Sequence, residues 1–210
     1  MIVSLNEIET TVLKAARGAG MAWGLAEEAA QAARWLAGRR LAFEPLFVLL
    51  FETEAWRFDI RLDSRSLSPL AVGGRVCPIR AGACLSDLDD MLPIRIERPL
   101  CPLLLAPFAA RSKKSLELAW KGATLRFGAG GVASPSRQAP ALHVASAEAA
   151  QLRLAGAADA SAALLTPCEG GLAINVAAWS KLQKFEAKTY VPASLESQLR
   201  GAGAALSDND

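Results

Sequence analysis

The spacing of apolar residues changes near residue 56, and this change constrains the fold more than any other feature of the sequence. Before it, apolar residues recur every three or four positions, which is the spacing of one face of an α-helix. After it, short runs such as 57–63 alternate apolar and polar residues, which is typical of a β-strand with one buried face. The predicted class is therefore α+β, helical first and rich in sheet afterwards.

The N-terminal segment 4–40 is predicted to form a helical hairpin. A first helix is expected over 5–17, preceded by a capping box of Ser4 and Glu7. A second helix is expected over 25–37, and its alanine-rich face should pack against the first helix. The apolar segment 44–56 lies between helix and strand in character, and we favour a third helix there.

The body from 57 to 178 is predicted to be a mainly antiparallel sheet. Two stretches, 64–84 and 128–140, are expected to be rich in turns, because glycine, proline and serine gather in them. The second is either a linker between two halves or a surface loop, and we favour a loop. Lys121 and Gly122 form the expected turn of a hairpin. Strands are predicted within 57–63, 93–99, 116–120, 125–127, 150–156 and 172–179, and around His143.

The C-terminal segment 179–210 is predicted to be helical and then to end in a polar tail. Trp179 begins the helical pattern, and a last short helix is expected over 193–200. With these elements, residues 1–210 are expected to form a single domain, since a chain of this length buries a sizeable core without a metal or disulfide.

Composition excludes several classes of function. The 23 basic and 21 acidic side chains give a formal charge of +2, which is too small to favour nucleic-acid binding. The longest apolar runs are shorter than the roughly 20 residues of a membrane span, and the N-terminus does not read as a signal peptide. A cytoplasmic protein that binds no membrane is expected. Its four irregularly spaced cysteines predict neither a disulfide framework nor a zinc site, and no other metal site is expected.

The tetrapeptide Arg-Gly-Ala-Gly occurs twice, at 17–20 and 200–203, and raises the question of a phosphate-binding loop. A dinucleotide site requires a strand entering the glycines, whereas here a helix enters. Glu27 and Glu28 are expected in the first turn of the second helix, where they would repel a phosphate. Each tetrapeptide is therefore interpreted as a helix end, and no cofactor is expected. Trp23 beside the first copy is a candidate to bind a substrate.

Three residues are candidates for catalysis. Cys168 lies in a turn of small residues beside Glu169, where a thiol is placed to act as a nucleophile or an acid–base group. His143 is the one histidine of the chain and the natural base for such a thiol, if the fold brings the two together. The alternative interpretation is that Cys168 is a turn cysteine packed under the sheet and that His143 is structural.

The tail that ends the chain carries Asp208 and Asp210 beside the terminal carboxylate. Such a tail is either without fixed structure or folded back over a cleft or a neighbouring subunit. In the second case these carboxylates are candidates to bind a substrate.

Both ends of the chain resemble an uncharacterised bacterial family of about this length. The likeness is carried by "SLNE", "RGAG" and "WGLAEEA" near the N-terminus, and by "TYVPAS", "GAG" and "DND" near the C-terminus. It implies a stand-alone bacterial protein and supplies no activity. The hairpin alone also looks like the opening of the malate/lactate dehydrogenase family that lacks a Rossmann fold, although this chain is too short for that enzyme.

Two hypotheses for function follow. The first is a small-molecule enzyme, or a small enzyme subunit, in carboxylic-acid or amino-acid metabolism. The alternative is a non-catalytic binding or assembly subunit that acts through its termini. In either case a small-molecule ligand is expected, together with a second copy of the chain or a partner subunit bound through apolar helix faces.

Overall fold

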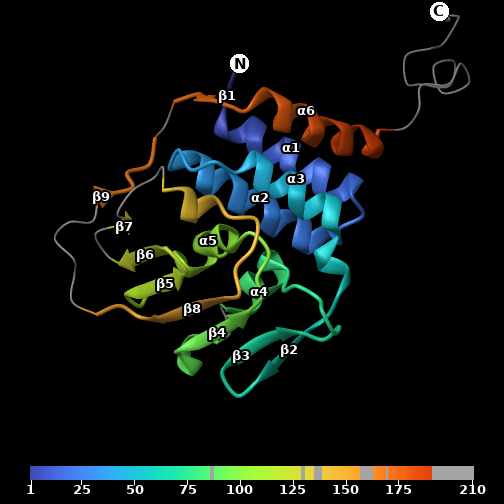
Figure 1. The fold of residues 1–210 in the computed structure, drawn as a ribbon. Helices are drawn as coiled ribbons and strands as arrows, with labels where there is room; N and C mark the ends of the chain where they lie inside the picture. Colours follow the sequence, from blue (N-terminus) through green and yellow to red (C-terminus); the bar gives the residue numbers. More distant parts are fainter. Residues whose placement is uncertain (86–87, 129–130, 135–138, 157–162, 169, 191–210) are drawn as a thin grey trace, which may run out of the picture.

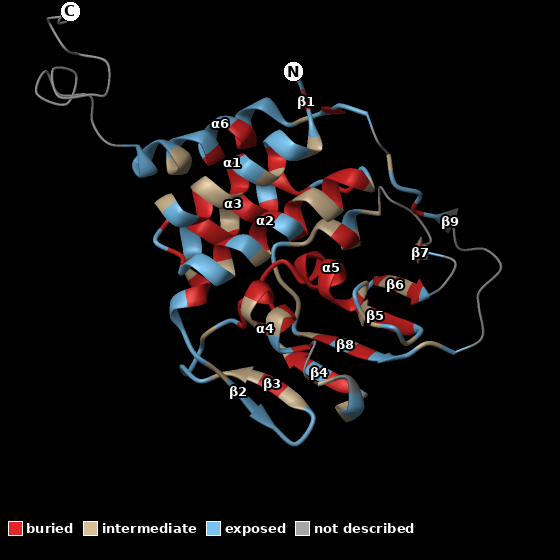
Figure 2. Cartoon of the chain, turned by 180° about the vertical axis from the view of Figure 1, so that it is seen from behind, coloured by how far each residue is buried: buried red, intermediate tan, exposed pale blue. Residues whose placement is uncertain are grey.

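The computed structural model describes residues 1–85, 88–128, 131–134, 139–156, 163–168 and 170–190. Helices lie on one face of a mixed, mainly antiparallel sheet, so the class is α+β as predicted (Figure 1). The buried residues lie within and between these two layers (Figure 2).

The outer helices are α1 (Leu5–Gly18), α2 (Trp23–Gly38), α3 (Glu44–Thr53) and α6 (Val176–Glu186). The Oγ of Ser4 accepts a hydrogen bond from the Glu7 amide at 3.1 Å, which confirms the predicted start of α1. The alanines of α1 and α2 are largely buried against each other, and they let the two helix backbones approach closely. The two predicted helices of the hairpin and the third helix are therefore confirmed.

The two ends of the described chain lie side by side. Strand β1 (Ile2–Val3) pairs antiparallel with β10 (Leu172–Ala173), and α6 packs along α1 (Figure 1). Asn175 caps the N-terminus of α6, because its side chain accepts from the Ala178 amide at 3.1 Å. The helix thus begins before Trp179, and the strand predicted over 172–179 is wrong beyond Ala173.

The first Arg-Gly-Ala-Gly ends a helix, as predicted, but its glycines serve other purposes. Gly18 is still helical, and a Cβ added there would lie 1.8 Å from the Phe185 carbonyl oxygen of α6. Gly18 is therefore required by the close packing of two helices, while Gly20, with φ of +94°, supplies the left-handed turn. Likewise Gly38 is helical, and Arg40 takes the left-handed conformation. The second copy lies outside the described residues.

The large sheet has the order β2-β3-β4-β8-β5-β6-β7-β9 among the described residues. Only β3 and β4 pair in parallel. The β-hairpin predicted around the Lys121-Gly122 turn is confirmed, with Gly122 at φ of +81°. The strands are β2 (Ile60–Asp63), β3 (Ser66–Pro69), β4 (Ile94–Glu97), β5 (Leu116–Trp120), β6 (Ala123–Gly128), β7 (Gly131–Ser134), β8 (Ala149–Leu154) and β9 (Ala163–Leu164).

Short helices fill the space between the sheet and the outer helices. They are α4 (Pro78–Leu85), α5 (Ala106–Ala109) and the 3-10 helix η3 (Pro102–Leu105), and both α4 and α5 contact α2 (Figure 1). On the same side of the sheet, Leu118 and Leu125 are fully buried. The opposite face of the sheet carries the polar residues of each alternation, such as Glu117.

Several stretches predicted as loops or strands differ in the structure. The 64–84 stretch contains β3 and α4: Pro78 is tolerated in the first turn of a helix, and Gly82 packs so closely on Phe108 that an added Cβ would lie 2.2 Å from that ring. The 128–140 stretch contains β7. The strand predicted around His143 is wrong, because the 3-10 helix η4 (Pro140–His143) begins at a proline that fixes its first turn.

No described helix is both long and apolar enough to cross a lipid bilayer.

Candidate functional site

A pocket of about 450 Å³ lies where the second half of α2 meets α5 and the segment 167–168. Its size falls within the usual range of small-molecule sites, roughly 300–1,000 Å³. Apolar atoms and guanidinium groups share its wall. The residues that line it are Leu5, Gln31, Arg34, Trp35, Gly38, Arg39, Pro107, Ala110, Arg111, Pro167 and Cys168.

Two of the three arginines in this wall are already paired within the chain. Arg34 forms an ion pair with Glu9, with 3.1 Å between Nη1 and Oε2, and also donates to Asn6. Arg111 donates to Glu28 at 2.6 Å and to Gln31 at 2.9 Å. Their charges are therefore compensated by the chain's own side chains.

Arg39 differs from both. Its guanidinium stacks on the indole of Trp35, with 4.0 Å from Cζ to the ring centroid, and donates to the Trp35 carbonyl oxygen at 3.4 Å. Its Nε is buried and has no hydrogen-bond partner among the described residues. Burial lowers the pKa of this guanidinium below its ordinary value. An arginine nevertheless keeps its charge at neutral pH.

Cys168 belongs to the same pocket. Its backbone amide donates to the Gly38 carbonyl oxygen at 2.7 Å, which fixes the turn against the C-terminal end of α2. The residue is partly buried. Cys168 therefore shares this wall with Trp35 and Arg39, and it packs at a helix end rather than under the sheet.

The other predicted site residues lie elsewhere or outside the described residues. His143 is not among the residues that line the Cys168 pocket. Glu169, and Asp208 and Asp210 of the predicted tail, lie outside the described residues.

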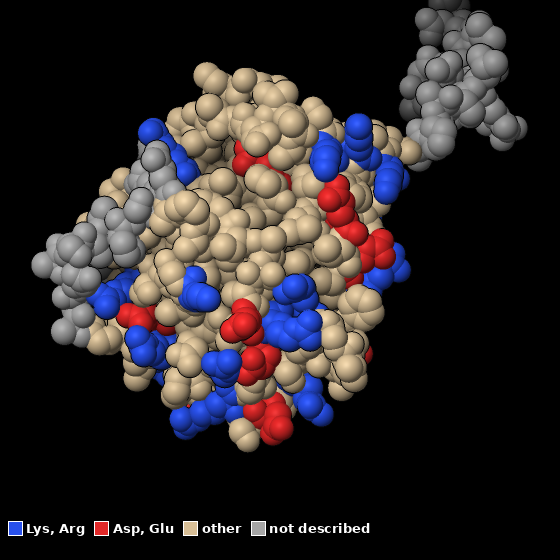
Figure 3. Space-filling view, viewed as in Figure 1, with Lys and Arg blue, Asp and Glu red and all other residues tan. Residues whose placement is uncertain are grey.

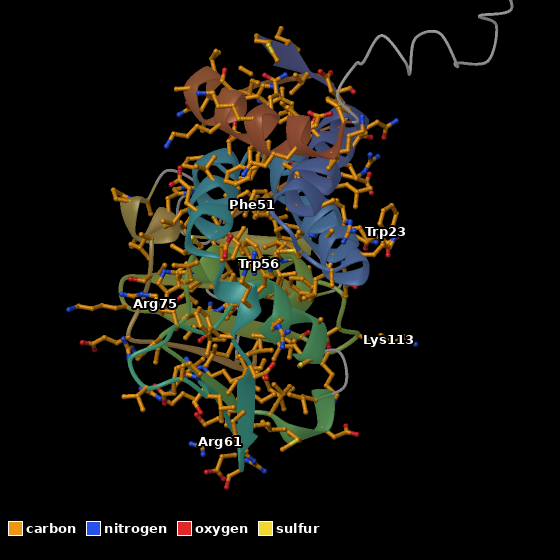
Figure 4. All side chains as sticks on the ribbon, turned by 90° about the vertical axis from the view of Figure 1, so that its right-hand side faces the viewer. Trp23, Phe51, Trp56, Arg61, Arg75 and Lys113 are labelled. Atoms are coloured by element: carbon orange, nitrogen blue, oxygen red, sulfur yellow. The ribbon has the colours of Figure 1, made fainter. Side chains whose placement is uncertain are left out.

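Trp23 lies at the start of α2 and is exposed, on the outer side of the helical layer (Figure 4). Its indole Nε1 donates to Glu27 at 2.7 Å, and the Arg17 guanidinium lies 5.4 Å from its ring centroid. Glu27 and Glu28 were predicted in the first turn of this helix. Because α2 begins at Trp23, they lie beyond the first turn. Glu27 binds Trp23 instead of the helix terminus.

The sequence did not identify Trp35 and Arg39 as residues of a binding pocket. The signal was present, because Trp35 and Arg39 are four residues apart and such residues face each other on a helix. A basic residue just after a helix is equally typical of an ordinary helix end, where it complements the helix dipole. Nothing local indicated that segment 165–168 would pack over that end.

Within the described ranges, no group of three or more histidine, cysteine, aspartate or glutamate residues gathers as metal ligands would. Figure 3 shows acidic and basic side chains mixed over the sheet-bearing half of the visible face. That face carries no broad basic patch of the kind that a nucleic acid requires.

Comparison with known proteins agrees with the predicted resemblance in the N-terminal part of the chain. Residues 3–46 match the model of a family described as a protein of unknown function (DUF3726), in agreement with the predicted likeness to an uncharacterised family. The matched segment spans β1, α1, α2 and the first residues of α3, including Trp35 and Arg39. No curated protein and no solved structure matches the chain.

Proposed function

We propose that the pocket beside α2 binds a small organic anion whose charged group is a carboxylate. One observation carries this proposal: Arg39 is a partly buried cation with an unsatisfied Nε, and no described residue of the pocket wall is acidic. A buried polar group without a hydrogen bond is costly, and a ligand that supplies the acceptor removes that cost. A carboxylate matches the fork of Nε and Nη of a guanidinium in a bidentate arrangement.

The helix dipole accounts for part of the Arg39 geometry but not for all of it. An arginine at the C-terminal end of a helix is stabilised by the exposed carbonyls, and the contact from Nη1 to the Trp35 carbonyl is of this kind. The buried Nε is not satisfied by that contact. The Arg39 Nε therefore remains available to donate a hydrogen bond to a ligand.

The remaining wall indicates the body of the ligand. Trp35, Pro107 and Ala110 offer apolar surface next to the guanidinium. An amino acid would also need an acceptor for its ammonium group, and none of the acidic residues that the structure describes lines the pocket. These features favour a carboxylic acid with a compact apolar or aromatic body, and they support the carboxylic-acid half of the predicted substrate class.

Binding of benzoate, compared with benzamide, tests the proposal by calorimetry. The two probes share a ring and differ in charge, so benzoate should bind and benzamide should bind at least tenfold more weakly. Substitution of Arg39 by glutamine should lower benzoate affinity by about 10- to 100-fold, the usual worth of a hydrogen bond to a charged group.

Arg34 provides the matched control. It lines the same pocket, but its charge is paired with Glu9. Arg34→Gln should therefore change benzoate affinity less than threefold. Equal losses in the two variants, equal binding of benzoate and benzamide, or no binding of any small carboxylate would each overturn the proposal.

A second candidate function is covalent chemistry at Cys168, because this thiol shares the pocket wall with Arg39. It would make the protein an enzyme rather than a binding subunit. The described wall contains no histidine or carboxylate to act as a base. Alkylation by iodoacetamide distinguishes the two: an activated thiol reacts faster than a free cysteine and is protected by benzoate, and an ordinary rate removes the enzymatic candidate.

Other expectations from the sequence stay predictions. They are a cytoplasmic location, a bacterial source and self-association. The apolar residues of α1, α2 and α3 are largely buried within one chain, so the helix faces expected to mediate self-association are already used.

A further inference from the structure

Among the described residues the sheet ends on one side at β2, and Leu62 in this strand and Phe58 just before it are exposed, while Ile60 is partly buried. Leu62 lies opposite Leu67 in the hairpin register, so both point to the inner face of the sheet. Leu67 is 1% exposed, whereas Leu62 is 41% and Phe58 is 49% exposed. The alternation of 57–63 predicted a strand with one buried face, and the described residues cover this face only in part.

The backbone of β2 also offers free pairing groups. The Asp59 carbonyl accepts from the Leu70 amide, so Asp59 is a hydrogen-bonded position of the β2–β3 ladder. Hydrogen-bonded and non-bonded positions alternate along an antiparallel strand. Ile60 and Leu62 therefore direct their amides and carbonyls away from β3, towards the open edge. The Phe58 amide already donates to the Ala55 carbonyl oxygen at 3.4 Å, so this residue offers only its carbonyl.

The charges of β2 and of the three residues before it, the first of which ends the 3-10 helix Ala55–Arg57, are self-complementary. Around Ile60 the sequence reads Arg57, Phe58, Asp59, Ile60, Arg61, Leu62, Asp63. A twofold axis at Ile60 places Asp59 of one strand opposite Arg61 of the other, and Arg57 opposite Asp63. It also places Phe58 opposite Leu62. Every charged pair is then of opposite sign, and the apolar residues form one continuous stripe.

We propose that two copies of the chain associate through β2, antiparallel and with the twofold axis at Ile60, so that the sheet continues from one copy into the other. This inference is independent of the pocket beside α2. The outward amides and carbonyls of Ile60 and Leu62, together with the Phe58 carbonyl, would form a second ladder, and Ile60 would face its own copy.

Charges on an edge strand often serve to prevent such pairing. A row of one sign would do so, because like charges then meet in any register. Here the signs alternate, and like charges meet only when the register slips. Arg61 has no ion pair among the described residues and lies at the outer end of the hairpin (Figure 4). Arg57 and Asp59 do form exposed pairs, with Glu54 and Arg80 respectively.

Sedimentation velocity over a broad range of concentration tests the proposal with the full chain. The wild type should dimerise reversibly. Arg61→Asp would place aspartate opposite Asp59 at two symmetry-related positions and should raise the dimer dissociation constant about tenfold or more. The double variant D59R/R61D exchanges the signs and should restore the wild-type value.

Arg65→Asp is the matched control for charge. Arg65 lies in the turn of the same hairpin, beyond the paired residues of this register, so the dissociation constant should stay within about twofold, the usual limit for a surface change without a partner. Circular dichroism should show all variants folded, because these side chains are exposed.

A disulfide trap tests the register in a C84S background, because Cys84 is exposed and could itself be oxidised. Directly opposed hydrogen-bonded residues have Cα atoms about 5.5 Å apart, within disulfide reach. Ile60→Cys should crosslink two copies under mild oxidation, and Leu62→Cys should not. A monomeric wild type, failure of the charge exchange to restore association, or crosslinking through Leu62→Cys alone would overturn the proposal.

Discussion

Glu117 on the outer face of the sheet and Arg39 at the end of α2 are both charged groups withdrawn from water, and the chain treats them differently. Glu117 is 3% exposed and lies directly between Arg126 and Arg153 on the neighbouring strands. Each arginine Nε donates to one of its carboxylate oxygens at 2.9 Å. The Nε of Arg39 has no such partner among the described residues.

The contrast separates a structural charge from a proposed binding group. A buried charge is tolerated when the fold completes its hydrogen bonds, as the strand register does for Glu117. A partly buried charge that the described chain leaves incomplete, in the wall of a pocket, indicates a ligand. Substitutions at the two sites should therefore change different quantities, stability at Glu117 and binding at Arg39.

The largest effect on stability is expected from Glu117→Ala. It removes the shared acceptor of two arginines and should lower the free energy of unfolding by about 2–3 kcal/mol, less than for a fully buried pair because both arginines reach water. Urea denaturation measures it. Glu97→Ala is the control, because Glu97 pairs with Arg95 at a more exposed position and should cost about 0.5 kcal/mol. Equal losses would contradict the structural role of Glu117.

The structural role of Glu117 should also appear in the pH dependence of the free energy of unfolding. Burial raises the pKa of the Glu117 carboxyl, but the hydrogen bonds from Arg126 and Arg153 outweigh it, so the pKa lies below its ordinary value. The unfolded state then binds a proton before the folded state does. The stabilisation is present above the unfolded pKa and is lost as pH falls through the folded pKa.

Glu117→Gln removes this titration. Its unfolding free energy should therefore decline less steeply than that of the wild type on acidification below the ordinary glutamate pKa. Urea titrations at a series of acidic pH values measure both slopes. Parallel profiles for the two proteins would show that Glu117 does not contribute to acid sensitivity.

The sequence predicted elements whose evidence is local and missed those that depend on packing. The capping box of Ser4 and the Lys121-Gly122 turn each act within a few residues, and the structure confirms both elements. Helix α4 was missed because Gly82, usually a loop signal, is required by its contact with Phe108. A close approach between residues far apart in sequence leaves no trace in the local pattern.

The candidate site was predicted only in part for the same reason. Cys168 was identified from its turn, but its neighbours in the pocket come from α1, α2 and α5. Trp35 and Arg39 carry a local i, i+4 signal that is equally typical of an ordinary helix end. Only the fold shows that the end of α2 is covered and that the Arg39 Nε is buried.

The two arginines that bind Glu117 should differ in importance. The Arg126 side chain is 29% exposed and that of Arg153 is 55% exposed. Because a more buried charge pair is less screened by water, Arg126→Ala should cost about 1 kcal/mol and Arg153→Ala about half of that. Urea denaturation of the two single variants gives the ranking. A larger loss for Arg153→Ala would mean that geometry, rather than burial, decides the strength of the pair.

The smallest effect on stability is expected at Arg39. Arg39→Gln keeps a side chain over Trp35 and removes a charge that burial already disfavours, so the free energy of unfolding should change by less than about 0.5 kcal/mol in either direction. Thermal unfolding with and without benzoate checks this. Benzoate should raise the Tm of the wild type, because a ligand that binds only the folded state stabilises it, and should leave the Tm of Arg39→Gln unchanged. A large loss of stability in Arg39→Gln without benzoate would place Arg39 with Glu117, as a structural charge.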